Sequence, residues 1–411
     1  MKVTLLTLGT RGDVQPYVNL AKGFKNHGHQ VILSTGRNFE SMAKQNGIDF
    51  APVDADFQAL INSEEGKAMM RNPFLARKHF VNIVQPMMVQ AMKSFYNLAK
   101  DSELVLYHVK SLGDFYADQF PHKMVRANVV PALEPTSEFP NPVFSSFGLP
   151  KSLNKLTYKL ADLGMSMMNN AIRDFRSSQS LSVQFPKKLK LPSVYGISPA
   201  FLSKPNDYPM NSYFTGFWQS ASGQALHPEI DDFISSGKTI VVTFGSMPFD
   251  LKIDPQQILV HLSEALKVNI VVVRGWGFEG TSRLNGISKV KVVDTAPFDK
   301  LFPKIGAVVH HGGVGTIAEC LRAGIPFLSC PVIFPMGDQH FWGMRSFQLG
   351  CSPKPIPLKK LTKELLVQKV DEMLKSQHMT RAAQHIASQL AREDGVENCI
   401  RLIEDRIIFT H

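Results

Sequence analysis

The 411-residue sequence contains no apolar run near the roughly 20 residues that a membrane-spanning helix needs. Its first apolar stretch, within MKVTLLTLGTRGD, is too short for a secretory signal, and no small-residue cleavage site follows it. The four cysteines all lie in the second half and form no C-x-x-C pair, which argues against a disulfide framework or a zinc site. These absences predict a soluble protein of the reducing cytoplasm.

Long runs of one charge are also missing, although the chain is basic overall. The formal net charge is +10, yet the lysines and arginines are scattered and form no basic tail. Such a charge permits attraction to nucleotides, to a membrane surface or to nucleic acid, without choosing among them. Weak association with a membrane surface therefore stays open, whereas nucleic-acid binding has no support beyond the charge and is not expected.

Short apolar segments alternate with helical patterns along most of the chain. The segments KVTLLTL, HQVILST, TIVVTFGS and NIVVVRG are typical of buried strands, and stretches with apolar residues at helical spacing lie between them. This alternation indicates parallel sheets covered by helices on both faces. A Pro- and Asn-rich stretch, LSKPNDYPMNSYFTG, divides the pattern and is typical of a linker.

We therefore predict an α/β protein with two Rossmann-like, doubly wound domains facing each other across a cleft. The expected boundaries are an N-terminal domain at 1–205, a linker at 206–225 and a C-terminal domain at 226–390, followed by a terminal helix at 391–411. Ligands of such sheets bind beyond the carboxyl ends of the strands. The expected site is consequently the cleft between the two sheets.

The segment AVVHHGGVGTIAEC, residues 307–320, is the most informative part of the sequence. An apolar strand runs into two histidines and three glycines, and a helix follows. Glycines there let backbone N–H groups approach an anion, and the helix N-terminus adds its dipole. His311 can donate a hydrogen bond to a phosphate, and Glu319 suits a pair of ribose hydroxyls. The alternative is a tight strand–helix turn with glycines for packing alone. The segment matches neither a P-loop nor the G-x-G-x-x-G spacing.

Residues 295–345, from TAPFDKLFPK to MGDQHFWGMR, resemble the donor-binding signature of UDP-sugar-dependent glycosyltransferases. Similar members are the plant UDP-glucosyltransferases, the bacterial antibiotic glycosyltransferases and, most closely, the sterol glucosyltransferases. GTRGDVQP near the start and GWGFEG at residues 275–280 resemble the same sterol and antibiotic branches. The resemblance implies a GT-B fold, with the donor on the second domain and the acceptor on the first. It also implies that the last helix crosses back onto the first domain.

The resemblance also implies roles for particular residues in holding the donor. His311 would contact the diphosphate with Ser246, Gly313, Gly315 and Thr316, while Glu319 would hold the ribose. Asp338 and Gln339 would hold the sugar hydroxyls. Thr295 stands where the plant signature has a tryptophan that stacks on uracil, so Trp276 is the candidate to replace it. The full set of expected donor contacts is Gly12, Ser246, Trp276, Phe298, His311, Gly313, Gly315, Thr316, Glu319, Asp338 and Gln339.

Asp13 of TLGTRGDVQP follows the first strand on a glycine-rich turn, which directs it toward the cleft. The resemblance makes it the general base that takes the acceptor hydroxyl proton. A free Asp has a pKa of about 3.9, which burial would raise and nearby Arg11 would lower. By local pattern alone, Asp13 would be a helix cap. RGD is also a cell-adhesion tripeptide, a role that does not fit a cytosolic chain.

Some further residues are weaker candidates for the acceptor side. His108 and Asp114 follow another strand of the first domain, and they either line the acceptor site or are ordinary loop residues. Trp342 either borders the acceptor or packs in the core. Asp54 and Asp56 form a D-x-D triplet, but it lies far along the chain from the phosphate turn, so we expect no metal.

Together these features predict an inverting glycosyltransferase that needs no cofactor. It would move a hexose, expected to be glucose from UDP-glucose, onto a hydroxyl of a lipophilic small molecule such as a sterol, terpenoid, polyphenol or macrolide. The abundant methionine and phenylalanine, 17 and 28 residues, suit an adaptable apolar acceptor pocket. The alternatives are a sugar-nucleotide epimerase of the same fold and a catalytically silent, glycosyltransferase-like partner protein. The sequence leaves the oligomeric state open.

Overall fold

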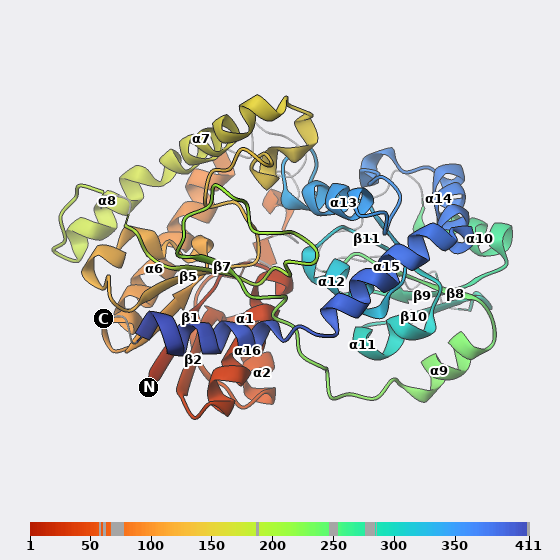
Figure 1. The fold of residues 1–411 in the computed structure, drawn as a ribbon, viewed down its shortest axis with the longest axis horizontal. Coiled ribbons are helices and arrows are strands. Elements are labelled where there is room, and N and C mark those ends of the chain that lie inside the picture. The colour runs from red at the N-terminus through yellow and green to blue at the C-terminus, as the bar shows by residue number, and fades with distance from the viewer. Residues whose placement is uncertain are drawn as a thin grey trace.

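The structure is a computed structural model of the chain, and it describes residues 1–56, 59–60, 63–66, 78–185, 189–245, 254–275, 284 and 286–408. Two α/β units lie side by side (Figure 1). Each is built on a parallel sheet with helices on both faces, as in the GT-B fold expected from the alternating pattern.

Seven described strands form the N-terminal sheet, in the order β3-β2-β1-β4-β5-β6-β7. They are β1 (Lys2–Leu6), β2 (Gln30–Gly36), β3 (Asp49–Val53), β4 (Leu104–Tyr107), β5 (Met124–Asn128), β6 (Ser193–Tyr195) and β7 (Ser212–Phe214). The α-helices of this unit whose bounds the structure describes are α1 (Arg11–Asn26), α2 (Glu40–Gln45), α6 (Gln85–Lys100), α7 (Asn154–Met165) and α8 (Asn169–Ser178). Successive strand residues serve opposite faces: Leu5 packs toward α1, and Leu6 packs toward α6.

Five described strands form the C-terminal sheet, in the order β10-β9-β8-β11-β12. They are β8 (Thr239–Thr243), β9 (Asn269–Val273), β10 (Val290–Val293), β11 (Ala307–His310) and β12 (Phe327–Ser329). The helices are α9 (Pro228–Ser235), α10 (Pro255–Leu266), α11 (Phe298–Leu301), α12 (Val314–Ala323), α13 (Asp338–Gln348), α14 (Lys363–Lys375) and α15 (Gln377–Leu390). One face of the sheet packs against α10 and α14, and the other packs against α12 and α15.

The connection between the units starts later than the sequence suggests. Residues 212–214 lie in the segment expected as linker, but they pair in parallel with β6 as strand β7. A three-residue strand between proline- and asparagine-rich turns is too short for its pattern to be recognised. The units also share one apolar cluster, in which Phe201 stacks on Trp342 and Phe139 packs on Phe341. The two sheets are therefore joined by packing as well as by the chain.

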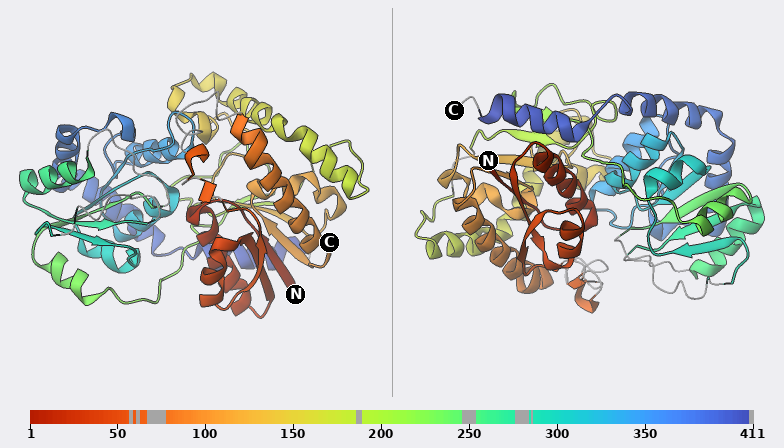
Figure 2. Two further views of the ribbon diagram at one scale, coloured as in Figure 1. Left: turned by 180° about the vertical axis from the view of Figure 1, so that it is seen from behind. Right: turned by 90° about the horizontal axis from the view of Figure 1, so that it is seen from below.

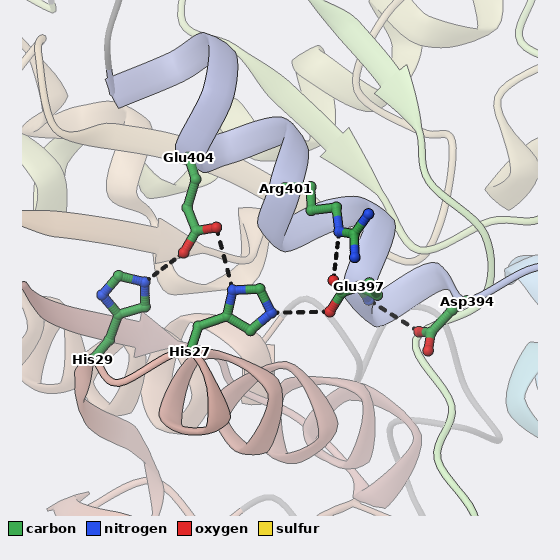
Figure 3. A network of polar contacts seen from close by, with 6 residues as sticks. All are labelled: His27, His29, Asp394, Glu397, Arg401 and Glu404. Carbon is green, nitrogen blue, oxygen red and sulfur yellow. Dashed lines mark hydrogen bonds and ion pairs between the residues drawn. The ribbon is translucent and has the colours of Figure 1, made fainter.

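The chain crosses back between the units after α15, and α16 (Gly395–Leu402) lies against α1 (Figures 1 and 2). Its buried residues Cys399 and Ile400 belong to the core of the N-terminal unit. A polar network fastens the same contact (Figure 3): His27 bonds Glu397 at 2.9 Å and Glu404 at 3.2 Å, and His29 bonds Glu404 at 2.8 Å. The last described helical turns thus complete the first domain.

Candidate active site

The turn after β1 fixes Asp13 at the start of α1. The backbone N–H of Thr10 donates to Oδ2 of Asp13 at 3.0 Å, which closes the helix start as half of a capping box. Gly9 has a φ of +135°, and a Cβ there would lie 2.1 Å from Oδ2 of Asp13. Only glycine therefore allows this turn and leaves room for the carboxylate.

The cation paired with Asp13 is Lys110, which the sequence analysis did not single out. Its Nζ donates to Oδ1 of Asp13 at 2.6 Å, although the lysine side chain is half-exposed. The expectation that Arg11 would be this cation is wrong. Arg11 lies two residues before Asp13 on the same helix, and residues at that spacing do not face each other. Lys110 arrives instead from the end of β4, the neighbour of β1.

The charged and polar groups around Asp13 favour its ionised form. Burial raises the pKa of Asp13, but the charge of Lys110 and the hydrogen bonds from Lys110 and Thr10 outweigh it, so the pKa is lowered. His108 lies beside them, buried, with its Nδ1 accepting from the backbone N–H of Lys110 at 3.2 Å. Burial lowers the His108 pKa to about 4, so this imidazole is neutral at physiological pH. Asp13 therefore faces a cation and a neutral ring.

The start of α13, in the C-terminal unit, brings Asp338 near Asp13 and Lys110 of the N-terminal unit. Burial lowers the pKa of Lys110, but the charge and hydrogen bond of Asp13, with a smaller contribution from the carboxylate of Asp338, raise it above its ordinary value. Burial raises the pKa of Asp338 itself. Nε1 of Trp342 donates to Oδ2 of Asp338 at 3.0 Å. Trp342 is fully buried against Phe201, so it packs in the core and orients Asp338. Oε1 of the buried Gln339 accepts from the N–H groups of residues 332 and 333, which ties the preceding loop to α13.

The turn at 311–313 lies against α13, and glycines surround the ring of His311. A Cβ on Gly313 would lie 2.4 Å from Nε2 of His311, and one on Gly245 would lie 3.2 Å from Cε1. Gly312 has a φ of +92°, and a Cβ there would lie 3.0 Å from the backbone oxygen of Gln339. Gly275 also packs on Gly245, because a Cβ added at Gly275 would lie 2.2 Å from the Gly245 carbonyl oxygen. Glycine is thus required here for close approach, as well as for the turn itself.

The protein offers anion-binding groups at this turn. Among the described residues, no side chain caps the start of α12, which leaves its first N–H groups without a capping partner there, beside Gly315 and Thr316. The buried Nδ1 of His311 has no hydrogen-bond partner among the described residues. Burial lowers the His311 pKa to about 4, so the ring is neutral and can both donate and accept. A helix start and a donor ring suit a phosphate.

Glu319 lies one turn into α12 and is held by the connection between the units. Nε2 of Gln219 donates to Oε1 of Glu319 at 2.9 Å and to the carbonyl oxygen of Gly315 at 3.3 Å. Burial raises the Glu319 pKa to about 7, against the lowering effect of Arg322. Nothing near Gln219 in the sequence marks it, because only the packing of the connection on α12 creates the contact.

The remaining expected residues have different positions. Ser246 and Trp276 lie outside the described residues, directly after Gly245 and Gly275. Phe298 begins α11 and stacks on Phe302 at 4.4 Å. Gly12 is exposed in the first turn of α1. Asp114 accepts hydrogen bonds from Tyr107 at 2.8 Å and from Arg126 at 2.7 Å, so it belongs to a network inside the first domain.

The described residues lack two features, a metal-binding cluster and a membrane-spanning helix. They contain no group of three acidic, histidine or cysteine side chains placed to hold a metal ion. Asp54 of the D-x-D triplet bonds Arg37 instead, and Asp56 accepts from the N–H of Ala59. Within the same described ranges, no helix combines the length and the apolar character needed to cross a bilayer.

Comparisons with known proteins agree with this geometry at both ends of the chain. Residues 3–105 match the glycosyltransferase family 28 N-terminal domain. Residues 262–404 match the erythromycin biosynthesis protein CIII-like C-terminal domain. The chain belongs to the GT-B glycosyltransferases. The first match holds the Asp13 turn, and the second holds the phosphate turn and α13.

Sterol 3-beta-glucosyltransferases are similar to nearly the whole of this glycosyltransferase-family chain. The protein of Arabidopsis thaliana is 30% identical over 96% of the chain, and that of Aspergillus oryzae is 30% identical over 98%. The chain spans 66% of the length of the first relative and 30% of the length of the second. Both are longer proteins than the part matched here.

Solved structures confirm the fold. A glycotransferase of kitacinnamycin superposes with a TM-score of 0.72 at 15% identity, covering 99% of each chain. The glycosyltransferase VinC, in complex with DTDP, superposes with a TM-score of 0.70 at 17% identity, covering 100% of each chain. The two facing domains expected from the sequence are therefore a GT-B pair.

Proposed function

We propose that this protein is an inverting glycosyltransferase that moves glucose from UDP-glucose onto a hydroxyl of a lipophilic, sterol-like acceptor. The observation that carries the proposal is the meeting of two half-sites from different domains. Asp13 and Lys110 come from the N-terminal unit, and Asp338 and the phosphate turn come from the C-terminal unit. The named relatives, sterol 3-beta-glucosyltransferases, support the sugar and the acceptor class.

The donor would lie on the C-terminal unit. Its diphosphate fits the uncapped start of α12 and the ring of His311, and its ribose fits the carboxylate of Glu319 that Gln219 holds. Asp338 would accept hydrogen bonds from sugar hydroxyls. Gln339 would contribute its amide nitrogen, because its oxygen already accepts two backbone hydrogen bonds. The base identity rests on the resemblance alone, since Trp276 lies outside the described residues.

In the reaction, Asp13 would take the proton of the acceptor hydroxyl as that oxygen attacks the anomeric carbon. The bond from this carbon to the diphosphate oxygen breaks at the same time, so the configuration inverts. The nucleoside diphosphate leaves with the electron pair, and the α12 start and His311 stabilise its charge. Lys110 keeps Asp13 ionised, which a carboxylate must be to accept a proton.

The test is product analysis with mixed donors and acceptors. The protein is incubated with UDP-glucose or dTDP-glucose and a panel of sterols, alcohols and phenols, and mass spectrometry identifies the products. We expect a glucoside of a sterol-like alcohol from UDP-glucose. Conversion of the sugar nucleotide without a glycoside would favour the epimerase, and no turnover of any pair would favour the silent partner protein.

The donor site has its own test in His311→Ala. Removing the ring should weaken UDP binding, measured by calorimetry, and should lower the transfer rate while the fold survives. The variant His340→Ala is a matched control, because His340 lies on α13 and bonds Ser145 of the N-terminal unit. An unchanged UDP dissociation constant in His311→Ala would remove His311 from the diphosphate site.

A further inference from the structure

Helix α7 carries its apolar residues on the outside. A row of leucines and one methionine at spacings of four and three residues is exposed to between 37% and 67%; the row is Leu149, Leu153, Leu156, Leu160, Leu163 and Met167. The chain is helical from residue 151 to 168, so this spacing places the five side chains from Leu153 to Met167 on one face, and Leu149 directly precedes the helical segment. Exposed leucines are ordinary one at a time, but a continuous row marks a surface that contacts something apolar. We call these six residues the α7 stripe.

The opposite face of α7 carries Asn154, Thr157 and the buried ring of Tyr158, and hydrogen bonds bind it to the protein. Asn154 and Thr157 are buried. Nδ2 of Asn154 donates to the carbonyl oxygen of Ser137 at 2.8 Å, and Oγ1 of Thr157 accepts from the N–H of Asn141 at 2.7 Å. These bonds fix the rotation of the helix about its axis. The outward direction of the leucines is therefore built into the fold, and rotating them inward would break buried hydrogen bonds.

Further exposed apolar side chains lie on the two loops that meet at the start of α13. Phe147, just before the stripe, is half-exposed, as are Ile333 and Met336 in the loop before α13. The two loops touch: the N–H of Gly337 donates to the carbonyl oxygen of Val143 at 3.2 Å. Exposed apolar side chains thus occur both on the loops before α13 and along α7, which forms an outer edge of the N-terminal unit (Figures 1 and 2).

Basic side chains follow one flank of the stripe. Lys151, Lys155 and Lys159 are exposed at intervals of four residues, and Asp162 is the acidic residue of that flank. Lys155 pairs with Asp207 at 3.0 Å and remains more than half exposed. Leucines beside lysines on one amphipathic helix suit the boundary between lipid headgroups and acyl chains.

We propose that the α7 stripe docks the protein on the surface of an anionic lipid bilayer. The helix would lie in the headgroup plane, with the leucines among the acyl chains and the lysines at the phosphates. A second copy of this chain is the less favoured occupant, because each chain carries a formal charge of +10 and the basic flanks would meet. The part of this idea that concerns delivery of the acceptor from the bilayer rests on the proposed function; the docking itself does not.

Vesicle sedimentation of the full chain tests the docking. We expect binding to vesicles of phosphatidylcholine with phosphatidylserine, and weaker binding to phosphatidylcholine alone. The triple variant Leu156→Gln, Leu160→Gln, Leu163→Gln should lower binding to the mixed vesicles by about tenfold or more, because it removes the inserted apolar area. Lysine-to-glutamine changes at 151, 155 and 159 should abolish only the preference for anionic vesicles.

The control variant is Met210→Gln, because Met210 is 93% exposed but lies apart from α7 in the chain. It should bind vesicles as the unchanged protein does. Circular dichroism verifies that the variants fold, which is expected since the changed leucines are exposed. Equal vesicle binding by the triple-leucine variant would overturn the proposal. So would a dimer in sedimentation velocity that the same variant dissolves, in a protein that binds no vesicles.

Activity separates this proposal from the proposed function. If both hold, the triple-leucine variant should lose transfer to a sterol embedded in vesicles and keep transfer to a soluble phenol. Vesicle binding without any glycosyl transfer would keep the docking surface and reject the enzyme. Transfer to both acceptors at unchanged rates, with no vesicle binding, would keep the enzyme and reject the docking surface.

Discussion

Replacing Asp13 with asparagine separates a general base from a helix cap. Asparagine has nearly the same shape, and its oxygen can still accept the hydrogen bond from Thr10 that is 3.0 Å long in the structure. The ion pair with Lys110 is lost, but that lysine is 49% exposed, so the loss costs at most about 1 kcal/mol of unfolding free energy. The variant should therefore fold.

The effect on catalysis should be much larger than the effect on stability. Removing a general base typically lowers the rate by a factor of about 10² to 10⁴. At 1.36 kcal/mol for each factor of ten, this raises the barrier by about 3 to 5 kcal/mol. The assay compares transfer to an aliphatic alcohol with transfer to a nitrophenol, whose more acidic hydroxyl needs less help and should show a smaller loss.

Two measurements accompany this assay. Calorimetry with UDP should give an unchanged dissociation constant, because the groups proposed to hold the diphosphate and ribose, namely His311, the start of α12 and Glu319, lie on the other domain. Asp13→Ala, which also removes the hydrogen-bond acceptor, should be less stable than Asp13→Asn and no more active. Near-normal transfer to the alcohol by folded, UDP-binding Asp13→Asn would refute the base assignment and leave Asp13 as a cap.

Three further predictions concern the contacts around this site and between the domains. Lys110→Gln removes the cation that lowers the Asp13 pKa, so the acid limb of the pH profile of kcat/KM should move to higher pH and return in Lys110→Arg; an unmoved limb would disconnect Lys110 from Asp13. Gln219→Ala should weaken UDP binding more than 2′-deoxy-UDP binding, because it releases Glu319; equal losses in calorimetry would indicate general damage. The hydrogen bond to Glu397 raises the His27 pKa, so this contact stabilises the fold below the ordinary pKa of about 6.5 and fades as pH rises through the raised value. The difference in urea stability between the natural protein and His27→Gln should therefore be larger in mildly acidic than in alkaline buffer, and a difference independent of pH would contradict this.

The sequence predicted the fold well because its buried strands are long apolar runs with helical patterns between them. The phosphate turn was equally visible, since its strand, glycines and helix are contiguous in the chain. The end of the first sheet was missed, because β7 has only three residues and its pairing with β6 is a contact across the fold. Local patterns thus identify elements better when the element itself supplies most of its stabilising contacts.

The site residues that escaped prediction have partners far away in sequence. Lys110 reaches Asp13 because β4 lies beside β1, and Gln219 reaches Glu319 because the connection between the domains packs on α12. Arg11 was expected to be the neighbouring cation because of its closeness in sequence, which on a helix does not mean contact. No pattern in a single sequence encodes such neighbours, whereas the position of each strand in the sheet order does.

The packing of α16 on α1 has a consequence for the order in which the chain folds during synthesis. Val396 and Ile400 lie so close to Gly23 that a Cβ there would be 2.5 Å from each, and Ile403 is fully buried in the same core. The ribosome delivers these residues only after the entire second α/β unit. Until then the first domain displays an uncovered apolar groove along α1, so this domain must wait for α16 and is exposed to chaperones and proteases in the interval.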